Sequence, residues 1–199
     1  EEGVGEQDIM RRVLTVVPTV DDKSFVKDAR GQYWRMYHQI DNSTSYDELP
    51  SAGHGYGMAF KFGEFIRHLH DFPHPPLHET IKDFHNGPKR LSDFNIALGQ
   101  TKRNGMAERA AGAREEIDFL SRHAGIFGQI QGMIQSAQLP LRVTHNDTKV
   151  NNILVDNVTR EALCVIDLDT VMPGTSLYDF GDLARTTLSA APEDETDLS

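Results

Sequence analysis

Residues 144–152 read Thr-His-Asn-Asp-Thr-Lys-Val-Asn-Asn, and they stand between two short stretches that predict strands, Leu141–Thr144 and Ile153–Val155. A third, continuously apolar stretch predicts another strand, Leu163–Asp167, and ends in a carboxylate. A loop between two strands can point its side chains toward the end of a neighbouring strand. Loops held by a rigid scaffold of strands often carry functional groups. These segments therefore predict one shared site.

Asp147 is the carboxylate that this loop offers for acid–base chemistry. Phosphoryl transfer from ATP requires a carboxylate that positions the attacking hydroxyl and accepts its proton, and oxygen ligands that hold Mg²⁺ against the phosphates. Asp147 fits the first role, and Asn152 and Asp167 fit the second. Asp169 is an auxiliary candidate for the metal. His145 would brace the loop by hydrogen bonding, as the catalytic-loop histidine of protein kinases does.

Each of these residues also has a purely structural interpretation. Asp147 could cap its own loop, and the Asp-Leu-Asp run at 167–169 could be a turn at the end of a strand. Lys149 would face either the acceptor or the solvent. A short three-residue pattern also arises by chance in some chains. The strand–loop–strand context and the second carboxylate favour the catalytic interpretation.

At greater length the sequence resembles a known group of enzymes. Residues 145–152 and 165–170 resemble the catalytic and metal-binding motifs of the aminoglycoside phosphotransferase and choline kinase superfamily. The longer segments 139–149, 165–174 and 178–182 resemble its bacterial N-acetylhexosamine 1-kinase branch. The resemblance touches most of the chain and is densest from 139 to 185.

That resemblance implies a protein-kinase-like α+β fold. It also implies transfer of the γ-phosphate of ATP, with Mg²⁺, to the anomeric hydroxyl of N-acetylglucosamine or N-acetylgalactosamine. Asp147 would be the base, and Asn152 and Asp167 the Mg²⁺ ligands. The backbone of the segment that leaves the last N-terminal strand would lie along the adenine, at Gln39, Ile40 and Asn42. The loop after the first long helix would face the sugar through His85 and Arg90.

The N-terminal part departs from the pattern of the family. A complete enzyme has a phosphate-covering loop and a strand residue, usually Lys, that reaches the phosphates. Gly3-Val4-Gly5 follows no strand and predicts a flexible end, and Lys23 and Lys27 flank a turn. We therefore expect residues 1–42 to be the remnant of an incomplete β lobe. Residues 43–199 would form a mainly helical lobe that carries the catalytic loop and the metal-binding strand.

The remaining pattern predicts strands first and helices later. A β-hairpin is expected from Val13–Val17 and Gln32–Tyr37, followed by a connector at 41–53. Apolar residues at helical spacing then predict a helix from Tyr56. Three further helices are expected, at about Met106–Arg122, Ile126–Gln135 and 179–190.

Composition limits the kinds of partner. The 199 residues carry a formal net charge of −10, with 38% hydrophobic and 25% charged residues and no dense Lys/Arg stripe. This balance argues against nucleic acid or an anionic membrane as the main partner, and it leaves a small-molecule substrate. The single cysteine, Cys164, lies in an apolar run and forms no disulfide framework, which favours a cytoplasmic protein.

Other functions remain as alternatives. The acceptor could be an aminoglycoside, a choline-like amine or another small alcohol. Because the phosphate-covering loop is missing, an inactive pseudokinase is a further alternative. A sugar-ester hydrolase or sulfatase is rejected, because Cys164 is followed by Val165-Ile166-Asp167 rather than by the Pro-x-Arg setting that a reactive cysteine would need.

Overall fold

The computed structural model describes residues 6–72, 77–101 and 103–189, and Gly3-Val4-Gly5 and the acidic tail after Pro192 lie outside these ranges. The α-helices are α1 (Glu6–Arg12), α2 (Ala52–His68), α3 (Gly87–Gln100), α4 (Ala107–Gly112), α5 (Arg114–Arg122), α6 (Gln129–Gln135) and α7 (Ser176–Leu188). The strands are β1 (Val26–Lys27), β2 (Tyr33–Trp34), β3 (Ser43–Thr44), β4 (Arg142–Thr144), β5 (Ile153–Asp156), β6 (Ala162–Val165) and β7 (Met172–Gly174). Short 3₁₀ turns cover Ala124–Gly128 (η1), Val150–Asn152 (η2) and Leu168–Thr170 (η3).

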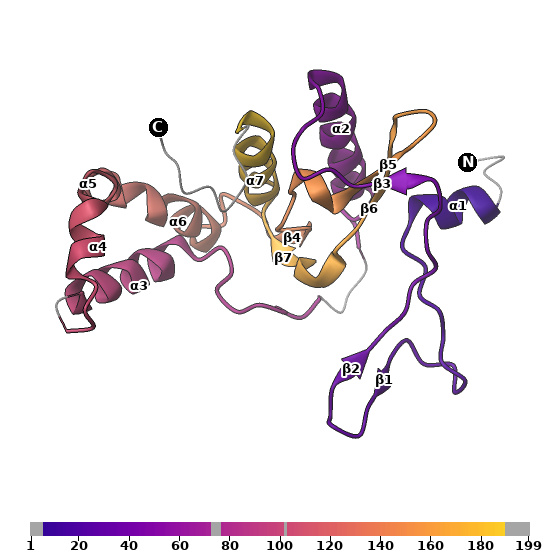
Figure 1. Cartoon of the computed structure of the whole chain (residues 1–199), viewed down its shortest axis with the longest axis horizontal. Coiled ribbons are helices and arrows are strands. Elements are labelled where there is room, and N and C mark those ends of the chain that lie inside the picture. Colours follow the sequence, from indigo (N-terminus) through magenta and orange to yellow (C-terminus); the bar gives the residue numbers. More distant parts are fainter. Residues whose placement is uncertain (1–5, 73–76, 102, 190–199) are drawn as a thin grey trace.

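The core lies where α2 packs on the small sheet β3–β5–β6 (Figure 1). The helix begins at Ser51, whose side chain accepts a hydrogen bond from the His54 amide, so one of the free N–H groups of the first turn is satisfied. Met58 and Phe62 lie one turn apart and are buried against the sheet. The predicted helix from Tyr56 is thus confirmed, and it begins four residues earlier than expected.

Two antiparallel ladders set the position of the catalytic loop. In one, β5 lies between β3 and β6, and Ile153 pairs with Val165. In the other, β4 pairs with β7, and Thr144 lies opposite Met172. The loop from 145 to 152 leaves the end of β4 and enters β5, so it connects the two ladders. The predicted strands at 141–144, 153–155 and 163–167 are confirmed, with β6 ending at Val165, whereas β7 was not predicted.

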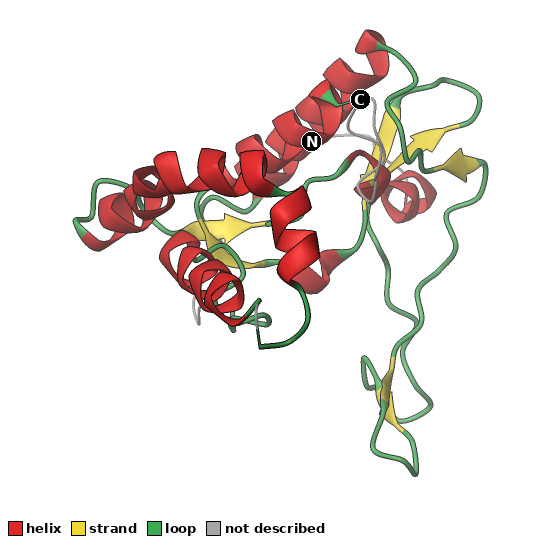
Figure 2. Cartoon of the chain, turned by 60° about the vertical axis from the view of Figure 1, so that its left-hand side comes forward, coloured by secondary structure: helices red, strands yellow, loops and turns green. Residues whose placement is uncertain are grey.

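The N-terminal hairpin projects as a long arm away from the body (Figure 2). At its base the chain pairs only at Val16 and Tyr37, and at its tip β1 pairs with β2. The prediction of a full strand at Val13–Val17 was therefore too long. At the tip, Tyr33 and Trp34 are 66% and 58% exposed.

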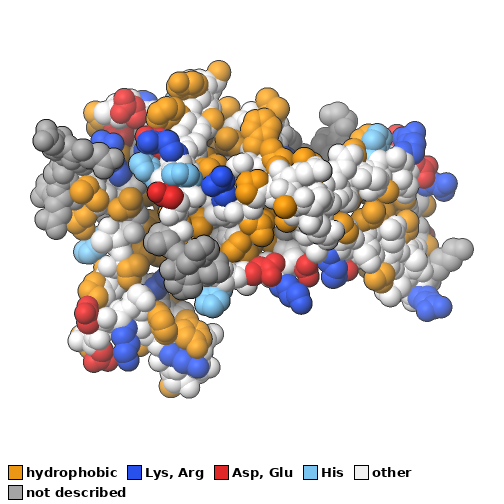
Figure 3. Space-filling model, turned by 180° about the vertical axis from the view of Figure 1, so that it is seen from behind, with side chains coloured by type: hydrophobic (Ala, Val, Ile, Leu, Met, Phe, Trp, Pro, Cys, Tyr) orange, Lys and Arg blue, Asp and Glu red, His pale blue; other side chains and the backbone are white. Residues whose placement is uncertain are grey.

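A second arm is helical and contains α3 to α6 (Figure 1). Helix α3 was not predicted; it begins with Asn86, whose side chain accepts from the Lys89 amide. The single helix expected at 106–122 is two helices, because the backbone breaks at Ala113 (φ −101°, ψ 30°). The helix expected at 126–135 begins with a 3₁₀ turn. On the face shown in Figure 3, basic side chains are scattered among acidic and hydrophobic ones.

Helix α7 begins earlier than the sequence suggested. The hydroxyl of Thr175 accepts from the Leu177 amide and starts the helix at Ser176, so Asp179 lies inside the first turns rather than at the helix start. This placement points Asp179 toward the catalytic loop. Over the described ranges of the chain, none of the helices combines the length and the apolar character that crossing a bilayer requires.

Candidate active site

His145 fixes the catalytic loop from the inside. Its ring is fully buried and packs edge-on against Phe62 and Phe65, with centroids 5.5 and 5.7 Å away. Nε2–H donates to the carbonyl of Ile166 at 2.9 Å, and Nδ1 accepts from the Asp147 amide at 3.3 Å. These two bonds define one neutral tautomer. The predicted bracing role agrees with these contacts.

Asn146 holds an uncommon backbone conformation by means of its side chain. It is buried with φ at 66°, in the left-handed region that Asn tolerates better than most residues. Its Nδ2 lies within hydrogen-bond distance of the carbonyls of Thr144, Thr170 and Met172, at 3.0–3.2 Å. The side chain thus ties the loop to both strands of the β4–β7 ladder.

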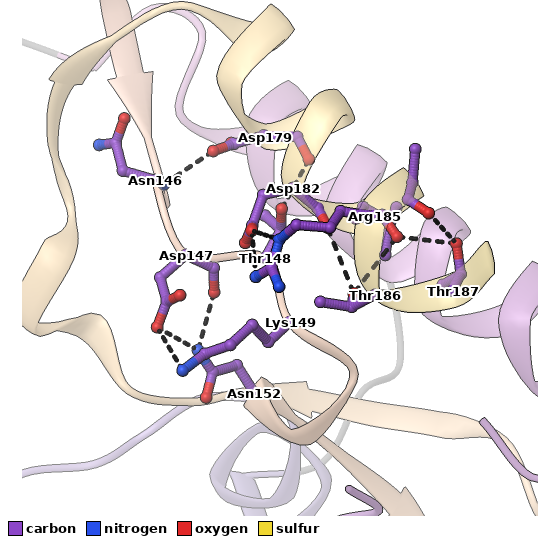
Figure 4. Close-up of polar contacts among 12 residues, drawn as sticks. Asn146, Asp147, Thr148, Lys149, Asn152, Asp179, Asp182, Arg185, Thr186 and Thr187 are labelled. Carbon is purple, nitrogen blue, oxygen red and sulfur yellow. Dashed lines mark hydrogen bonds and ion pairs between the residues drawn. The ribbon is translucent and has the colours of Figure 1, made fainter. Parts of the chain in front are cut away.

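Asp179 anchors the same loop from α7. Its two carboxylate oxygens accept from the amides of His145 (3.1 Å) and Asn146 (2.7 Å), and the latter bond is drawn in Figure 4. Its backbone carbonyl accepts from the hydroxyl of Thr148 at 2.6 Å. Burial raises the pKa of Asp179 above its ordinary value, although the two amide hydrogen bonds oppose that rise. One acidic side chain therefore fixes two successive peptide groups.

Asp147, Lys149 and Asn152 lie together on the other side of the loop (Figure 4). Asn152 Nδ2 donates to the Asp147 carbonyl at 2.7 Å and to its Oδ2 at 3.0 Å. Lys149 Nζ lies 3.3 Å from the same Oδ2, and the Asp147 side chain is 18% exposed. The carboxylate is thus oriented by two donors and still reaches solvent, as a base that meets a substrate must.

Ile166, directly after β6, joins the end of that strand to the loop at 145–152. Its amide donates to the Asn152 carbonyl at 2.9 Å, and its own carbonyl accepts from His145. Asp167 follows directly, is exposed, and has left-handed backbone angles (φ 58°, ψ 58°). The structure therefore brings Asp147, Asn152 and the backbone of Asp167 into one small region.

Asp169 lies in a different environment. Its carboxylate pairs with Arg35 of the hairpin arm, and 61% of its side chain is exposed. Its backbone carbonyl accepts from the hydroxyl of Thr80 at 2.9 Å. The proposed auxiliary role at the metal stays a prediction.

The segment predicted to contact adenine is tied to the body. The Ile40 carbonyl accepts from the Ser43 hydroxyl at 2.6 Å, and the Asn42 carbonyl accepts from the Asn157 amide at 2.8 Å. Ile40 is buried and Gln39 is exposed. Nucleotide binding by Gln39, Ile40 and Asn42 stays a prediction.

His85 lines a pocket of about 400 Å³ beside the catalytic loop. The pocket lies between residues 77–86, α6 and the β4–β7 ladder, and its polar lining includes Glu79, Asp83 and Gln131. His85 Nε2 also donates to the Asn146 carbonyl at 2.7 Å. Arg90 donates to the Phe84 carbonyl at 3.3 Å. Contact of His85, Arg90 or Lys149 with a substrate stays a prediction.

Comparison with known proteins identifies the group to which this site belongs. A family model described as a phosphotransferase enzyme family, abbreviated APH, matches residues 9–198. The chain belongs to this family. Among solved structures, a microcompartment-associated aminopropanol kinase is 18% identical, with a TM-score of 0.51 over 92% of this chain and 60% of that one. ADP-bound aminoglycoside phosphotransferase APH(2'')-Ib is 16% identical, with a TM-score of 0.45 over 85% and 52%.

These findings confirm the expected α+β, kinase-like class. The chain spans about 60% of the length of the aminopropanol kinase.

The donor chemistry of the site suits a hard divalent cation. The described part of the chain contains no cluster of three or more His, Cys, Asp or Glu side chains arranged to hold a metal. Asn152 and Asp167 instead offer an amide and a carboxylate oxygen, and Mg²⁺ in phosphoryl-transfer enzymes takes few protein ligands because the phosphates supply others. Asn152 Nδ2 is committed to Asp147, so its Oδ1 is the atom suited to a cation.

Cys164 takes no part in this chemistry. It is buried, and burial raises the pKa of its thiol to about 11. A thiol of that kind is not a nucleophile at neutral pH, in keeping with the rejection of a cysteine-dependent hydrolase.

Sequence reasoning missed the roles of two residues. Asp179 stood inside the segment 178–182 that resembles the family, but nothing local shows that its side chain reaches the catalytic loop. His85 was expected to face a sugar and is bonded to the loop backbone. Family membership was visible in the motifs, whereas these long-range contacts depend on how the helices pack.

Proposed function

We propose that this chain transfers the γ-phosphate of ATP to the hydroxyl of a small molecule. The observation that carries the proposal is a pair of hydrogen bonds at Ile166. Its amide donates to the Asn152 carbonyl, and its carbonyl accepts from His145 Nε2. They hold the backbone before Asp167 against the loop that presents Asp147. These contacts support the proposal, because phosphoryl transfer requires a base and oxygen ligands for a cation close together.

The residues would then have distinct roles. Asp147 Oδ2, fixed by Asn152 and Lys149, orients the acceptor hydroxyl and takes its proton. Lys149 would remain at that carboxylate and offset its charge as the anionic phosphate approaches. Asn152 and Asp167 would hold Mg²⁺, which supplies charge neutralisation on the phosphates when it is bound. The backbone of Gln39, Ile40 and Asn42 would contact the adenine.

For the acceptor, we propose the anomeric hydroxyl of an N-acetylhexosamine. The support is the resemblance of residues 139–185 to N-acetylhexosamine 1-kinases. A second candidate, an alcohol that carries an amine, is favoured by the carboxylates of Glu79 and Asp83 on the pocket beside the loop. One solved relative in fold is an aminopropanol kinase.

The test is phosphorus NMR of the complete natural polypeptide that carries this sequence, with ATP, Mg²⁺ and a panel of acceptors. The panel contains N-acetylglucosamine, N-acetylgalactosamine, an amino alcohol and an aminoglycoside. Asp147→Asn should lower turnover by about 10²- to 10⁴-fold, the usual contribution of general-base catalysis, and leave ATP binding nearly unchanged. Asp118→Asn, on the exposed side of α5, is the control and should turn over normally.

A sugar-1-phosphate signal that disappears in Asp147→Asn supports both the reaction and the base. A phosphorylated amine-bearing acceptor in its place would overturn the sugar and keep the reaction. Unchanged turnover in Asp147→Asn would exclude this residue as the base. No phosphorylated product from a folded protein with any acceptor would contradict the proposed function.

A further inference from the structure

Residues 77–86 contact both halves of the candidate site from outside it. Thr80 donates its hydroxyl proton to the carbonyl of Asp169, just after the proposed metal ligand. His85 donates from Nε2 to the carbonyl of Asn146, just before the proposed base. The mechanism proposed above assigns no role to either contact.

The bond from His85 completes a clamp on one peptide group. The Asn146–Asp147 peptide has its C=O bonded to His85 at 2.7 Å and its N–H bonded to His145 Nδ1 at 3.3 Å. With both ends bonded, this peptide plane cannot rotate without breaking a hydrogen bond in a partly buried site. Because this peptide plane ends at the Cα of Asp147, its orientation fixes the direction in which the Asp147 side chain leaves the backbone.

The His85 ring is itself held in place. It stacks on Tyr178, with centroids 4.6 Å apart and planes 27° apart, and it contacts Phe84 at 4.7 Å. Tyr178 immediately precedes Asp179, whose carboxylate holds the amides of His145 and Asn146. Tyr178, which supports the His85 ring, and Asp179, which binds the loop, thus lie on the same turn of α7.

We propose that His85 is a positioning residue for Asp147, acting through the Asn146–Asp147 peptide rather than by touching a substrate. This inference rests on the proposed role of Asp147 as the base. His85 also lines the 400 Å³ pocket, so a molecule in that pocket lies against the residue that orients the loop.

The test uses three variants. His85→Phe keeps a ring against Tyr178 and removes the donor, whereas His85→Gln restores a donor without the ring. His123→Phe is the matched control, because His123 also bonds through a ring nitrogen to a backbone carbonyl (Phe119, 2.8 Å) and contacts a phenyl ring, but on α5 of the helical arm.

The first readout is hydrogen exchange of the Asp147 amide by NMR, which needs no catalysis. Losing the constraint should speed this exchange by about fivefold in His85→Phe, the effect of one hydrogen bond. His85→Gln should recover most of the protection, and His123→Phe should leave it unchanged. Unchanged exchange in a folded His85→Phe would overturn the clamp, whatever the activity of the protein.

The second readout is steady-state kinetics with the best acceptor. A base displaced by a fraction of an ångström should lower kcat by about ten- to a hundredfold with little change in KM for either substrate. A raised acceptor KM with unchanged kcat would overturn positioning and indicate direct substrate contact. If Asp147→Asn keeps its activity while His85→Phe loosens the amide, Asp147 is not the base, positioning of a base by His85 fails with it, and the clamp stands as a structural device only.

Discussion

At the scale of single residues, the site depends on two left-handed positions that are not glycine. Asn146 and Asp167 have φ values of 66° and 58°. Asn146 directly precedes the proposed base, Asp147, and Asp167 is itself a proposed metal ligand. Such conformations cost free energy and persist where the surroundings over-determine them. For Asn146 the surroundings are its own amide contacts and the carboxylate of Asp179.

Replacing Asp179 with Asn should loosen the catalytic loop. An amide has one acceptor oxygen, so one of the two buried N–H groups of His145 and Asn146 would lose its partner. An unsatisfied buried donor costs about 1–3 kcal/mol, and the free energy of unfolding should fall by that amount. Urea unfolding followed by circular dichroism measures it. A loss no larger than that of the exposed control Asp118→Asn would show that the two amides find other partners.

What the sequence could reveal at this scale was local. Asp147, Asn152 and His145 were identifiable because they share one short loop with a recognisable spacing. The partners of that loop are far away in the sequence: Asp179 lies 32 residues after Asp147, and His85 lies 62 residues before it. No periodic pattern in the sequence links either residue to the loop. Their contacts exist only because α7 and the segment 77–86 pack against the same loop.

At the scale of elements, the β4–β7 ladder leaves no room for a side chain at its end. A Cβ built on Gly174 would collide with Thr144 Oγ1 and lie 2.5 Å from Asn146 Oδ1. The ladder can therefore be this close to the catalytic loop only with glycine at that position. The loop at 145–152 and strand β7 therefore fit closely against one another.

Gly174→Ala should destabilise the protein, and Gly132→Ala should not. The first forces a methyl group into buried polar atoms, at a cost of about 1–3 kcal/mol. The second adds a methyl group on α6 where nothing lies within 4 Å, and alanine in a helix is favoured by about 1 kcal/mol over glycine. Thermal unfolding of both variants measures the difference. Equal shifts of the same sign would contradict the steric argument.

Several elements were predicted wrongly for physical reasons. Helix α3 has few strongly apolar residues and begins with Gly87-Pro88, which suggests a loop, although Pro is favourable in the first helical turn. Strand β7 contains Pro173 and Gly174, both of which argue against a strand when the sequence is considered alone. Not every aromatic residue of α2 belongs to the core: Phe62 is buried, whereas Phe60 is 58% exposed.

At the scale of the whole molecule, one ion pair links the first helix to the body. Arg11 of α1 lies 2.9 Å from Asp156 at the end of β5, and it also donates to the Asp41 carbonyl. Asp156 accepts from the amides of Thr159 and Val158 as well. This carboxylate thus joins the N-terminal segment, the turn after β5 and the sheet.

Stability should therefore depend on the protonation of Asp156. The amides of Thr159 and Val158, and then Arg11, hold the pKa of Asp156 at about 2, below its ordinary 3.8. A lowered pKa stabilises the folded state above the unfolded-state value, and this contribution is lost as pH falls from 3.8 toward 2. The difference in Tm between wild type and Asp156→Asn should be largest near pH 6 and shrink across that window.

The variant Arg11→Met separates the causes of this effect. It removes the contribution of Arg11 to the lowered pKa of Asp156 and keeps those of the Thr159 and Val158 amides. The difference in Tm between wild type and Arg11→Met should therefore change over the same pH window with a smaller amplitude. Calorimetry between pH 2 and 6 measures both variants. A Tm difference for Asp156→Asn that stays constant down to pH 2 would contradict the assigned cause.

The broad architecture followed from the sequence, but the arrangement of its parts did not. The hairpin before the helices was visible in residues 13–135, and the loop between two strands was visible in residues 139–167. The packing of α3 to α6 depends on close approaches such as that of Gly87 to the Phe127 carbonyl. Such close approaches leave no pattern in the order of residues.

The helical arm also matters for engineering. Residues 87–135 form one continuous insert between α2 and β4, and the contacts that hold Asp147 come from outside it. Two of its residues, Gln131 and Ile134, nevertheless line the pocket beside the catalytic loop. We therefore expect a mutant library confined to residues 87–135 to change the lining of this pocket while leaving Asp147, Asn152 and Asp167 intact, which makes the arm the place to begin directed evolution.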